Sequence, residues 1–209
     1  KLRTENLAYA RNKMLDTINN EYKYEYFIMM DTNEYSCIGN INVDILKEAL
    51  IKYPNYDSIS FDREAGYYDT WALSFHPFIY SFFHFVDYKK VVKDMRKDFN
   101  KLIHIYKTKK NYSIIPVYSA FNGFAIYKRK KFLKCTYDSN INLNLFPKGS
   151  INNQINLINV KKKEDLSNDC EHRKFHLEAI FKNNANIGIY PKSLFSKFIN
   201  PPKNLRGPA

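Results

Sequence analysis

Five consecutive apolar residues, Tyr26–Met30, stop abruptly at Asp31, and this run constrains the fold more than any other feature of the sequence. A strand that is buried on both faces has such a continuous apolar run, which is typical of parallel or mixed sheets in α/β proteins. In these sheets, ligands bind beyond the carboxyl ends of the strands. The loop that begins at Asp31 is therefore predicted to lie at the functional edge of the sheet.

Helix-like and strand-like segments alternate along the rest of the chain. Amphipathic stripes predict helices over 5–19 (with Thr4 as N-cap), from the N-cap Asn42 to about residue 53, over 88–106 and over 171–181. Apolar runs predict strands at 58–61, 114–118, 124–127 and 187–190, with an Asn122-Gly123 turn and a tail from Pro191 onward. The alternation favours an α/β layer fold with a mixed sheet flanked by helices. We expect one domain over 1–198, with a polar insertion or loop at 139–168 and a tail at 199–209.

The composition indicates a folded, basic protein. The 209 residues include 33 Lys+Arg and 21 Asp+Glu, a net charge of +12, and 44% are hydrophobic, which excludes a disordered chain. The most apolar window, 78–86, is too short to span a bilayer, so no transmembrane segment is expected. The excess positive charge indicates either an anionic partner or solvated surface lysines.

The cysteines and the first residues bear on location. Cys37, Cys135 and Cys170 are odd in number and far apart, which favours a reduced compartment over a disulfide framework. No apolar signal core follows Lys1, so a cytoplasmic location is expected. The chain does not begin with Met, which indicates a trimmed chain or a fragment.

The loop Asp31-Thr32-Asn33-Glu34 presents several oxygen atoms within a few residues. Mg²⁺ and Mn²⁺ prefer oxygen ligands and take their remaining ligands from water and substrate phosphates. Asp31, Asn33 and Glu34 are therefore candidate metal ligands. The alternative is an ordinary solvent-exposed turn after a strand.

Two further segments carry side chains suited to binding. Arg3, Arg11 and Asn12 could contact phosphate, ribose or base, although such residues also form the solvated face of helices. Asp69 and Trp71 lie in an aromatic segment, where a carboxyl pKa can be raised and rings can stack on a sugar or base. The alternative for this second segment is a strand whose aromatic residues belong to the core.

The segment Cys170-Glu171-His172-Arg173, with His176, opens the last predicted helix. His172 and His176 would share a helix face, so a zinc site with Cys170 is conceivable, but neither an HExxH order nor a second cysteine pair supports it. A Glu-His pair suits proton transfer or the orientation of a hydroxyl group. Core or capping roles are the alternative.

Taken in order, the segments RTENLAYARN, YFIMMDTNE, YDTWAL, AFNGFAIYK, CEHRKFHL and NIGIYP resemble glycosyltransferases of the GT-A fold. They are most similar to viral and microbial relatives of the fungal capsule-associated mannosyltransferases. The resemblance covers roughly residues 3–191 without the polar insertion. It implies a GT-A (Rossmann-like) sheet that lacks its first strand or strands. It also implies Mn²⁺- or Mg²⁺-assisted transfer of a sugar from a nucleotide-diphosphate donor to an acceptor hydroxyl.

The resemblance also implies roles for individual residues. It assigns Asp31 and Asn33, with Glu34, to the metal; Arg3, Arg11 and Asn12 to the donor; Asp69 and Trp71 to the acceptor or transferred sugar; and Glu171 and His172 to the closing side of the site. Either Asp69 or Glu171 is the expected base of an inverting reaction. Asn33 stands where the family pattern has a second acid, which removes one negative charge.

Two other functions are compatible with the residues. A non-catalytic basic module would bind nucleic acid or anionic surfaces through the basic runs 128–131 and 161–163. Neither run is interleaved with the aromatic residues of a stacking groove, and both are also explained as solvated charge. A degenerate glycosyltransferase would bind glycan without catalysis. The expected partners are a nucleotide-sugar donor and a glycan or other hydroxyl acceptor, without nucleic acid.

Overall fold

A five-stranded mixed sheet forms the centre of the protein. The computed structural model describes residues 3–32, 36–37, 39–64, 66–140, 142–146 and 169–195. The strands are β1 (Tyr26–Met30), β2 (Ser58–Asp62), β3 (Ile115–Val117), β4 (Phe124–Lys128) and β5 (Ile187–Ser193), in the spatial order β1-β4-β2-β5-β3. β4 is antiparallel to β1 and β2, β5 is parallel to β2, and β3 is antiparallel to β5. The strands β1, β2 and β5 therefore end at the same edge of the sheet.

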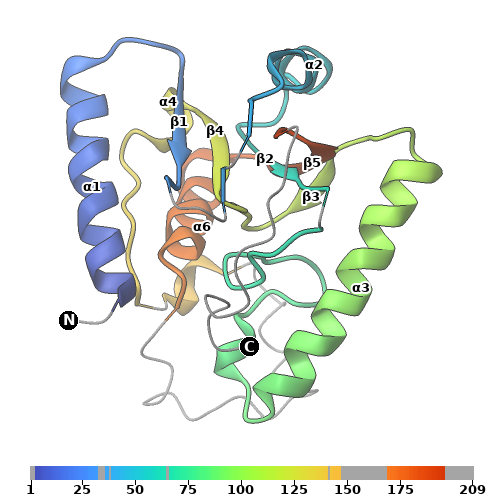
Figure 1. Cartoon of the computed structure of the whole chain (residues 1–209). Helices are drawn as coiled ribbons and strands as arrows, with labels where there is room; N and C mark the ends of the chain where they lie inside the picture. Colours follow the sequence, from blue (N-terminus) through green and yellow to red (C-terminus); the bar gives the residue numbers. More distant parts are fainter. Residues whose placement is uncertain are drawn as a thin grey trace.

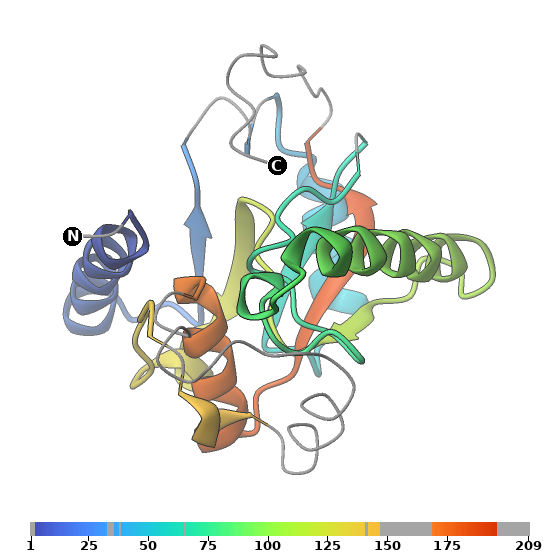
Figure 2. The same cartoon turned by 90° about the horizontal axis from the view of Figure 1, so that it is seen from below.

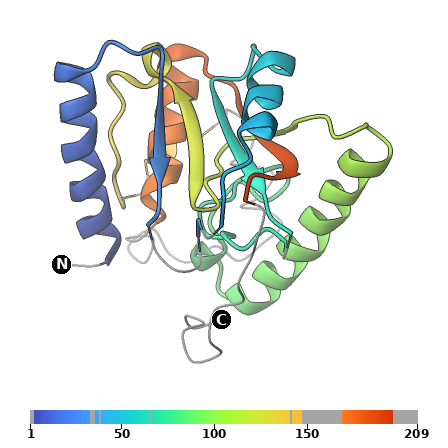
Figure 3. The same ribbon diagram turned by 45° about the horizontal axis from the view of Figure 1, so that its top comes forward.

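Helices cover both faces of this sheet (Figures 1 and 3). Side chains of α1 (Arg3–Glu21), α3 (Tyr88–Thr108) and α6 (Glu171–Asn183) join the larger core on one face. The helix α2 (Val43–Lys52) joins a smaller core on the other face. Three short helices complete the described elements: η1 (Phe82–His84), α4 (Arg129–Phe132) and η2 (Leu143–Leu145). β4 shows the two-residue alternation of a strand between two cores, with Ala125 and Tyr127 in the larger one and Phe124 and Ile126 in the smaller one.

The strand predicted at Tyr26–Met30 forms, but the expectation that it is buried on both faces is wrong. β1 is an edge strand: Phe27 and Met29 are buried, whereas Ile28 and Met30 are 46% and 40% exposed. The physical reason is that α2, the helix on that face, packs against β5 rather than β1. The continuous apolar run therefore identified the strand correctly but not its surroundings.

The predicted helix at Asn42 is confirmed in detail. The Asn42 side chain accepts hydrogen bonds from the backbone N–H groups of Asp44 (3.1 Å) and Ile45 (3.2 Å), as an N-cap does. Thr4, in contrast, is not a cap, because α1 already includes Arg3 and the Thr4 side chain is buried in the first turn.

Two further expectations, the tail from Pro191 and the strand alternative around Asp69, are corrected. β5 continues through Pro191 to Ser193, so the chain does not leave the sheet at Pro191. The predicted strands on either side of the Asn122-Gly123 turn both form, as β3 and β4, and they lie apart in the sheet because β3 pairs with β5 while β4 lies between β1 and β2. The aromatic segment around Asp69 is a loop with a turn rather than a strand.

The α/β class, with a five-stranded mixed sheet flanked by helices, is confirmed. The GT-A assignment, the missing first strand, the domain limits and the cytoplasmic location stay predictions. Most of the polar insertion at 139–168 and all of the tail at 199–209 lie outside the described residues. No helix in the described ranges is both long and apolar enough to cross a membrane. All three cysteines are free thiols, in agreement with the absence of a disulfide framework.

Candidate functional site

A cavity of about 360 Å³ lies at the edge of the sheet where β1 ends. α1 and α6 both begin at this edge, because each runs antiparallel to the strand that follows it (Figures 1 and 2). The cavity is lined by seven of the residues predicted for the site: Arg3, Arg11, Asp31, Asp69, Trp71, Glu171 and His172. Fold topology thus brings together side chains from α1, the end of β1, the aromatic loop and α6.

Arg11 is the central charged group of this cavity. Its Nη2 donates to Asp31 Oδ1 at 2.8 Å, and its Nη1 forms an ion pair with Glu171. The guanidinium also lies over the rings of Phe121, 5.0 Å from the centroid, and Tyr137, 5.7 Å from the centroid. The side chains of Arg11 and Glu171 are almost fully buried. Arg11 therefore serves to hold two carboxylates beside each other inside the protein.

Asp69 is held by backbone groups rather than by a cation. It accepts hydrogen bonds from the N–H groups of Ala72 (3.2 Å) and Asn122 (3.3 Å). Burial raises the pKa of the Asp69 carboxyl group, and the nearby Asp31 adds to this, while the two hydrogen bonds oppose it. A carboxyl group whose pKa is raised toward neutrality is suited to accept a proton.

Asn122 positions the loop that carries Asp69. Its backbone is left-handed, with φ of 55°, a conformation that asparagine tolerates better than most residues. Its side chain accepts from the N–H of Tyr68 at 3.1 Å and donates to the carbonyl of Phe61 at 2.8 Å. The sequence predicted a turn at this position, and the structure adds that the turn anchors a second loop beside the cavity.

In the cavity wall, the ring nitrogens of His172 and the Nε1 of Trp71 are buried polar atoms without a hydrogen-bond partner among the described residues. His172 is 2% exposed, and its ring stacks on that of Phe121 with 3.8 Å between the ring centroids. Its Nε2 lies 3.8 Å from Glu171 Oε1. Burial, followed by the charge of Arg11, lowers the pKa of His172 well below its usual value, so the ring is neutral at pH 7. Buried polar groups in proteins normally have a hydrogen-bond partner. The unpaired nitrogens of His172 and Trp71 can therefore accept a polar ligand as that partner.

Arg173 is a positioning residue to which the sequence analysis gave no role. Its buried guanidinium donates to the carbonyls of Trp71 (2.7 Å) and Ile79 (3.0 Å), and its Nε donates to Asp169 at 3.0 Å. These contacts tie the loop of Trp71 to α6. An arginine is rarely buried without partners, but the sequence does not reveal which arginine is buried.

The zinc alternative receives no support from the described residues. His176 is a satisfied core residue, with Nδ1 2.9 Å from Ser119 Oγ and Nε2 3.2 Å from Tyr127 Oη. Burial lowers its pKa to about 3. Within the described ranges, no group of three or more His, Cys, Asp or Glu side chains could hold a metal ion.

The predicted divalent-ion site comprises Asp31, Asn33 and Glu34, of which Asp31 belongs to the described residues. Asp31 faces the cavity, but its carboxylate is already paired with Arg11. Asn33 and Glu34 lie outside the described residues. The described donor set therefore does not by itself complete a Mg²⁺ or Mn²⁺ site.

Asn12 does not line this cavity. Its side-chain amide donates to the carbonyl of Tyr137 at 2.9 Å and accepts from the N–H of the same residue at 2.8 Å. These bonds attach the segment after α4 to α1. A donor-binding role for Asn12 stays a prediction.

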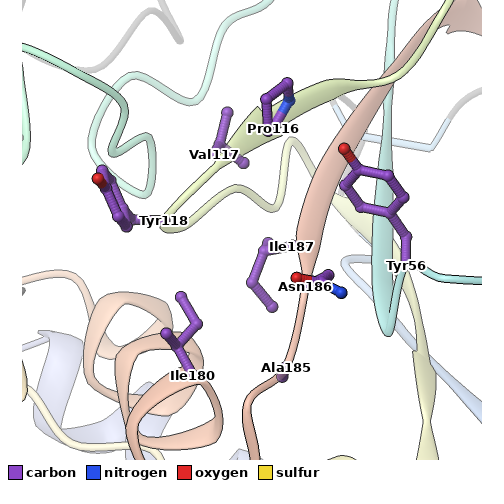
Figure 4. A pocket seen from close by; sticks show the side chains of 8 residues that line it. All are labelled: Tyr56, Pro116, Val117, Tyr118, Ile180, Ala185, Asn186 and Ile187. Atoms are coloured by element: carbon purple, nitrogen blue, oxygen red, sulfur yellow. The ribbon is translucent and has the colours of Figure 1, made fainter.

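A second cavity, of about 330 Å³, lies where β5 begins, at the opposite edge of the sheet (Figure 4). None of the described residues in its wall is charged, and the polar side chains among them are Tyr56, Tyr118 and Asn186. The Asn186 amide is already engaged, since its Nδ2 donates to the carbonyl of Asn55 at 2.9 Å. The first cavity, with its carboxylates and arginines, is therefore the candidate functional site.

Fold and site together define an α/β protein with a mixed sheet and a polar, aromatic-lined cavity at the edge where β1 ends. No protein-family model, curated protein or solved structure matches the chain.

Proposed function

We propose that this protein is a glycosyltransferase that moves a sugar from a nucleotide-diphosphate donor to an acceptor hydroxyl group. The observation that carries the proposal is the composition of the cavity at the end of β1. It combines three carboxyl groups with aromatic rings and with the unpartnered polar groups of Trp71 and His172. A sugar offers hydroxyl groups to such polar atoms and a C–H face to such rings.

We assign the role of general base to Asp69 rather than Glu171. Burial raises the pKa of Asp69, and a base works best when its pKa approaches the working pH. Glu171, in contrast, is already engaged in a buried ion pair with Arg11. In the proposed inverting step, the acceptor hydroxyl gives its proton to Asp69 as its oxygen bonds to the anomeric carbon. The bond from that carbon to the diphosphate breaks, and the diphosphate leaves with the electron pair.

Metal assistance is part of the proposal, with Asp31, Asn33 and Glu34 as the ligands that the resemblance implies. A divalent ion there would neutralise the charge of the departing diphosphate. Because Asp31 is paired with Arg11, the ion would compete with a guanidinium for that carboxylate. Comparison of Mn²⁺, Mg²⁺ and EDTA measures whether transfer depends on the ion.

The experiment is a panel of UDP- and GDP-sugars, tested by thermal shift and by donor hydrolysis or transfer, with Mn²⁺, Mg²⁺ or EDTA. We expect one donor to stabilise the protein and to be consumed. Asp69→Asn should lower the transfer rate by about 10²–10⁴-fold while donor binding persists. Asp98→Asn, an exposed carboxylate of α3, is the matched control. Full transfer by Asp69→Asn, or no response to any donor, would contradict the proposal.

The basic-module alternative has little support in the first basic run. Lys128 pairs with Asp57 at 3.2 Å, and Arg129 and Lys131 donate to backbone carbonyls. These side chains hold α4 against its neighbours instead of forming a free patch. The second run lies outside the described residues. Salt-sensitive binding of an oligonucleotide, without binding of any nucleotide-sugar, would favour this alternative.

A further inference from the structure

The cavity divides its charges between an acidic interior and a basic margin. Asp31, Asp69 and Glu171 contribute three carboxyl groups, and among the described arginines that line the cavity only Arg11 is buried. Arg11 already pairs with both Asp31 and Glu171. A phosphate placed beside Arg11 would therefore meet more negative than positive charge. This argues against the donor-binding role that the sequence resemblance implies for Arg11.

Two other arginines line the same cavity from opposite sides. Arg3 stands in the first turn of α1 and Arg96 in the middle of α3, and the two helices flank the carboxyl edge of the sheet (Figure 2). Both residues are exposed, and neither side chain pairs with a residue in the described ranges. The N-terminal end of α1 adds partial positive charge beside Arg3.

We propose that Arg3 and Arg96 form the phosphate-binding site of the cavity, with Arg11 acting as an internal clamp for the carboxylates. This inference rests on the proposed function and extends it to a residue, Arg96, that the sequence analysis did not select. The diphosphate of the donor lies between the two exposed guanidinium groups, each of which can bind phosphate oxygens in a bidentate manner. The uncharged sugar lies inward, toward the carboxylates and Trp71.

The test measures binding of UDP, GDP and inorganic pyrophosphate to the full chain by calorimetry. Arg96→Gln and Arg3→Gln should each weaken binding of pyrophosphate and of the preferred nucleotide by about 10-fold or more. Lys97 is an exposed residue next to Arg96 on α3 and does not line the cavity. The control variant Lys97→Gln therefore removes one positive charge but should bind pyrophosphate like the parent protein. Thermal melting of each variant checks that it is folded.

The outcomes separate this inference from the proposed function. Parent-like pyrophosphate binding by both arginine variants would overturn the inference while leaving sugar transfer intact. An equal loss for Lys97→Gln would also overturn it, because the effect would then be one of net charge. Pyrophosphate binding that depends on Arg3 and Arg96, without binding or use of any nucleotide-sugar, would support the phosphate site and refute the transferase. Absence of any phosphate binding by the parent protein would refute both.

Discussion

Replacing Arg11 with methionine is expected to destabilise the protein by about 4 kcal/mol, because two carboxylates then lose their shared cation. Removing one partner of a buried ion pair costs about 3–5 kcal/mol. The Asp31 side chain is 27% exposed, so water relieves part of its cost, whereas Glu171 is 4% exposed. The lost cation–π contacts with two rings add about 0.5–1 kcal/mol each.

Urea unfolding followed by circular dichroism measures this loss from the midpoint and the slope of the transition. Lys13→Met, an exposed basic residue of the same helix, should change the stability by less than about 0.5 kcal/mol. Glu171→Gln removes one of the two stranded carboxylates. The double variant, Arg11→Met with Glu171→Gln, should lose about 1–3 kcal/mol less free energy of unfolding than the sum of the losses in the two single variants.

Two results would refute the role of Arg11 as a clamp. One is a loss below about 1 kcal/mol in Arg11→Met, which would mean that water already compensates both carboxylates. The other is strict additivity with Glu171→Gln, which would mean that the two residues do not interact across the cavity wall. Either result would also restore Arg11 as a candidate for phosphate binding.

The pH dependence of the stability and two glycine substitutions provide further predictions. The folded-state pKa of His176 is depressed to about 3 from 6.5, so its stabilising contribution is present above pH 6.5 and is lost as the pH falls toward 3. Between pH 7 and pH 5 the part of this loss due to His176 is about 2 kcal/mol, so urea unfolding should show a loss smaller by that amount in His176→Gln but not in Tyr127→Phe, which keeps the imidazole. Gly66→Ala should cost about 1–2 kcal/mol from its positive φ alone, since a Cβ there meets nothing. Gly123→Ala should lower the melting temperature further, because its Cβ would lie 2.5 Å from Ser36 Cβ; equal melting temperatures would contradict this.

Local sequence patterns predicted most secondary structure because each pattern reflects short-range physics. The Asn42 cap depends only on the next three residues, and the stripe of α3 depends only on helical periodicity. The Tyr26–Met30 run shows the limit of such patterns. Whether a strand is central or at an edge depends on which elements pack beside it, and here Ile28 and Met30 stay 46% and 40% exposed.

For the candidate site, too, the sequence predicted some features and not others. The chemical types at Asp31, Asp69 and Glu171 could be selected from the sequence, because acids after a strand or beside aromatic residues are recognisable. The role of Arg11 as their clamp could not, since it depends on contacts across 20 and 160 positions of the chain. The same holds for Arg96, which belongs to an ordinary solvated helix face until α3 is placed beside the cavity.

The sequence by itself determined the α/β class, the ends of several elements and the set of polar residues available for chemistry, because these follow from side-chain type and spacing. Only the tertiary structure decided which of these residues meet, which are satisfied by one another, and which are left for a ligand. The reason is that burial and electrostatic pairing are properties of neighbours in space. Asn12 illustrates this: it was selected for the site by its position in the chain, yet its amide is bound to the backbone of Tyr137.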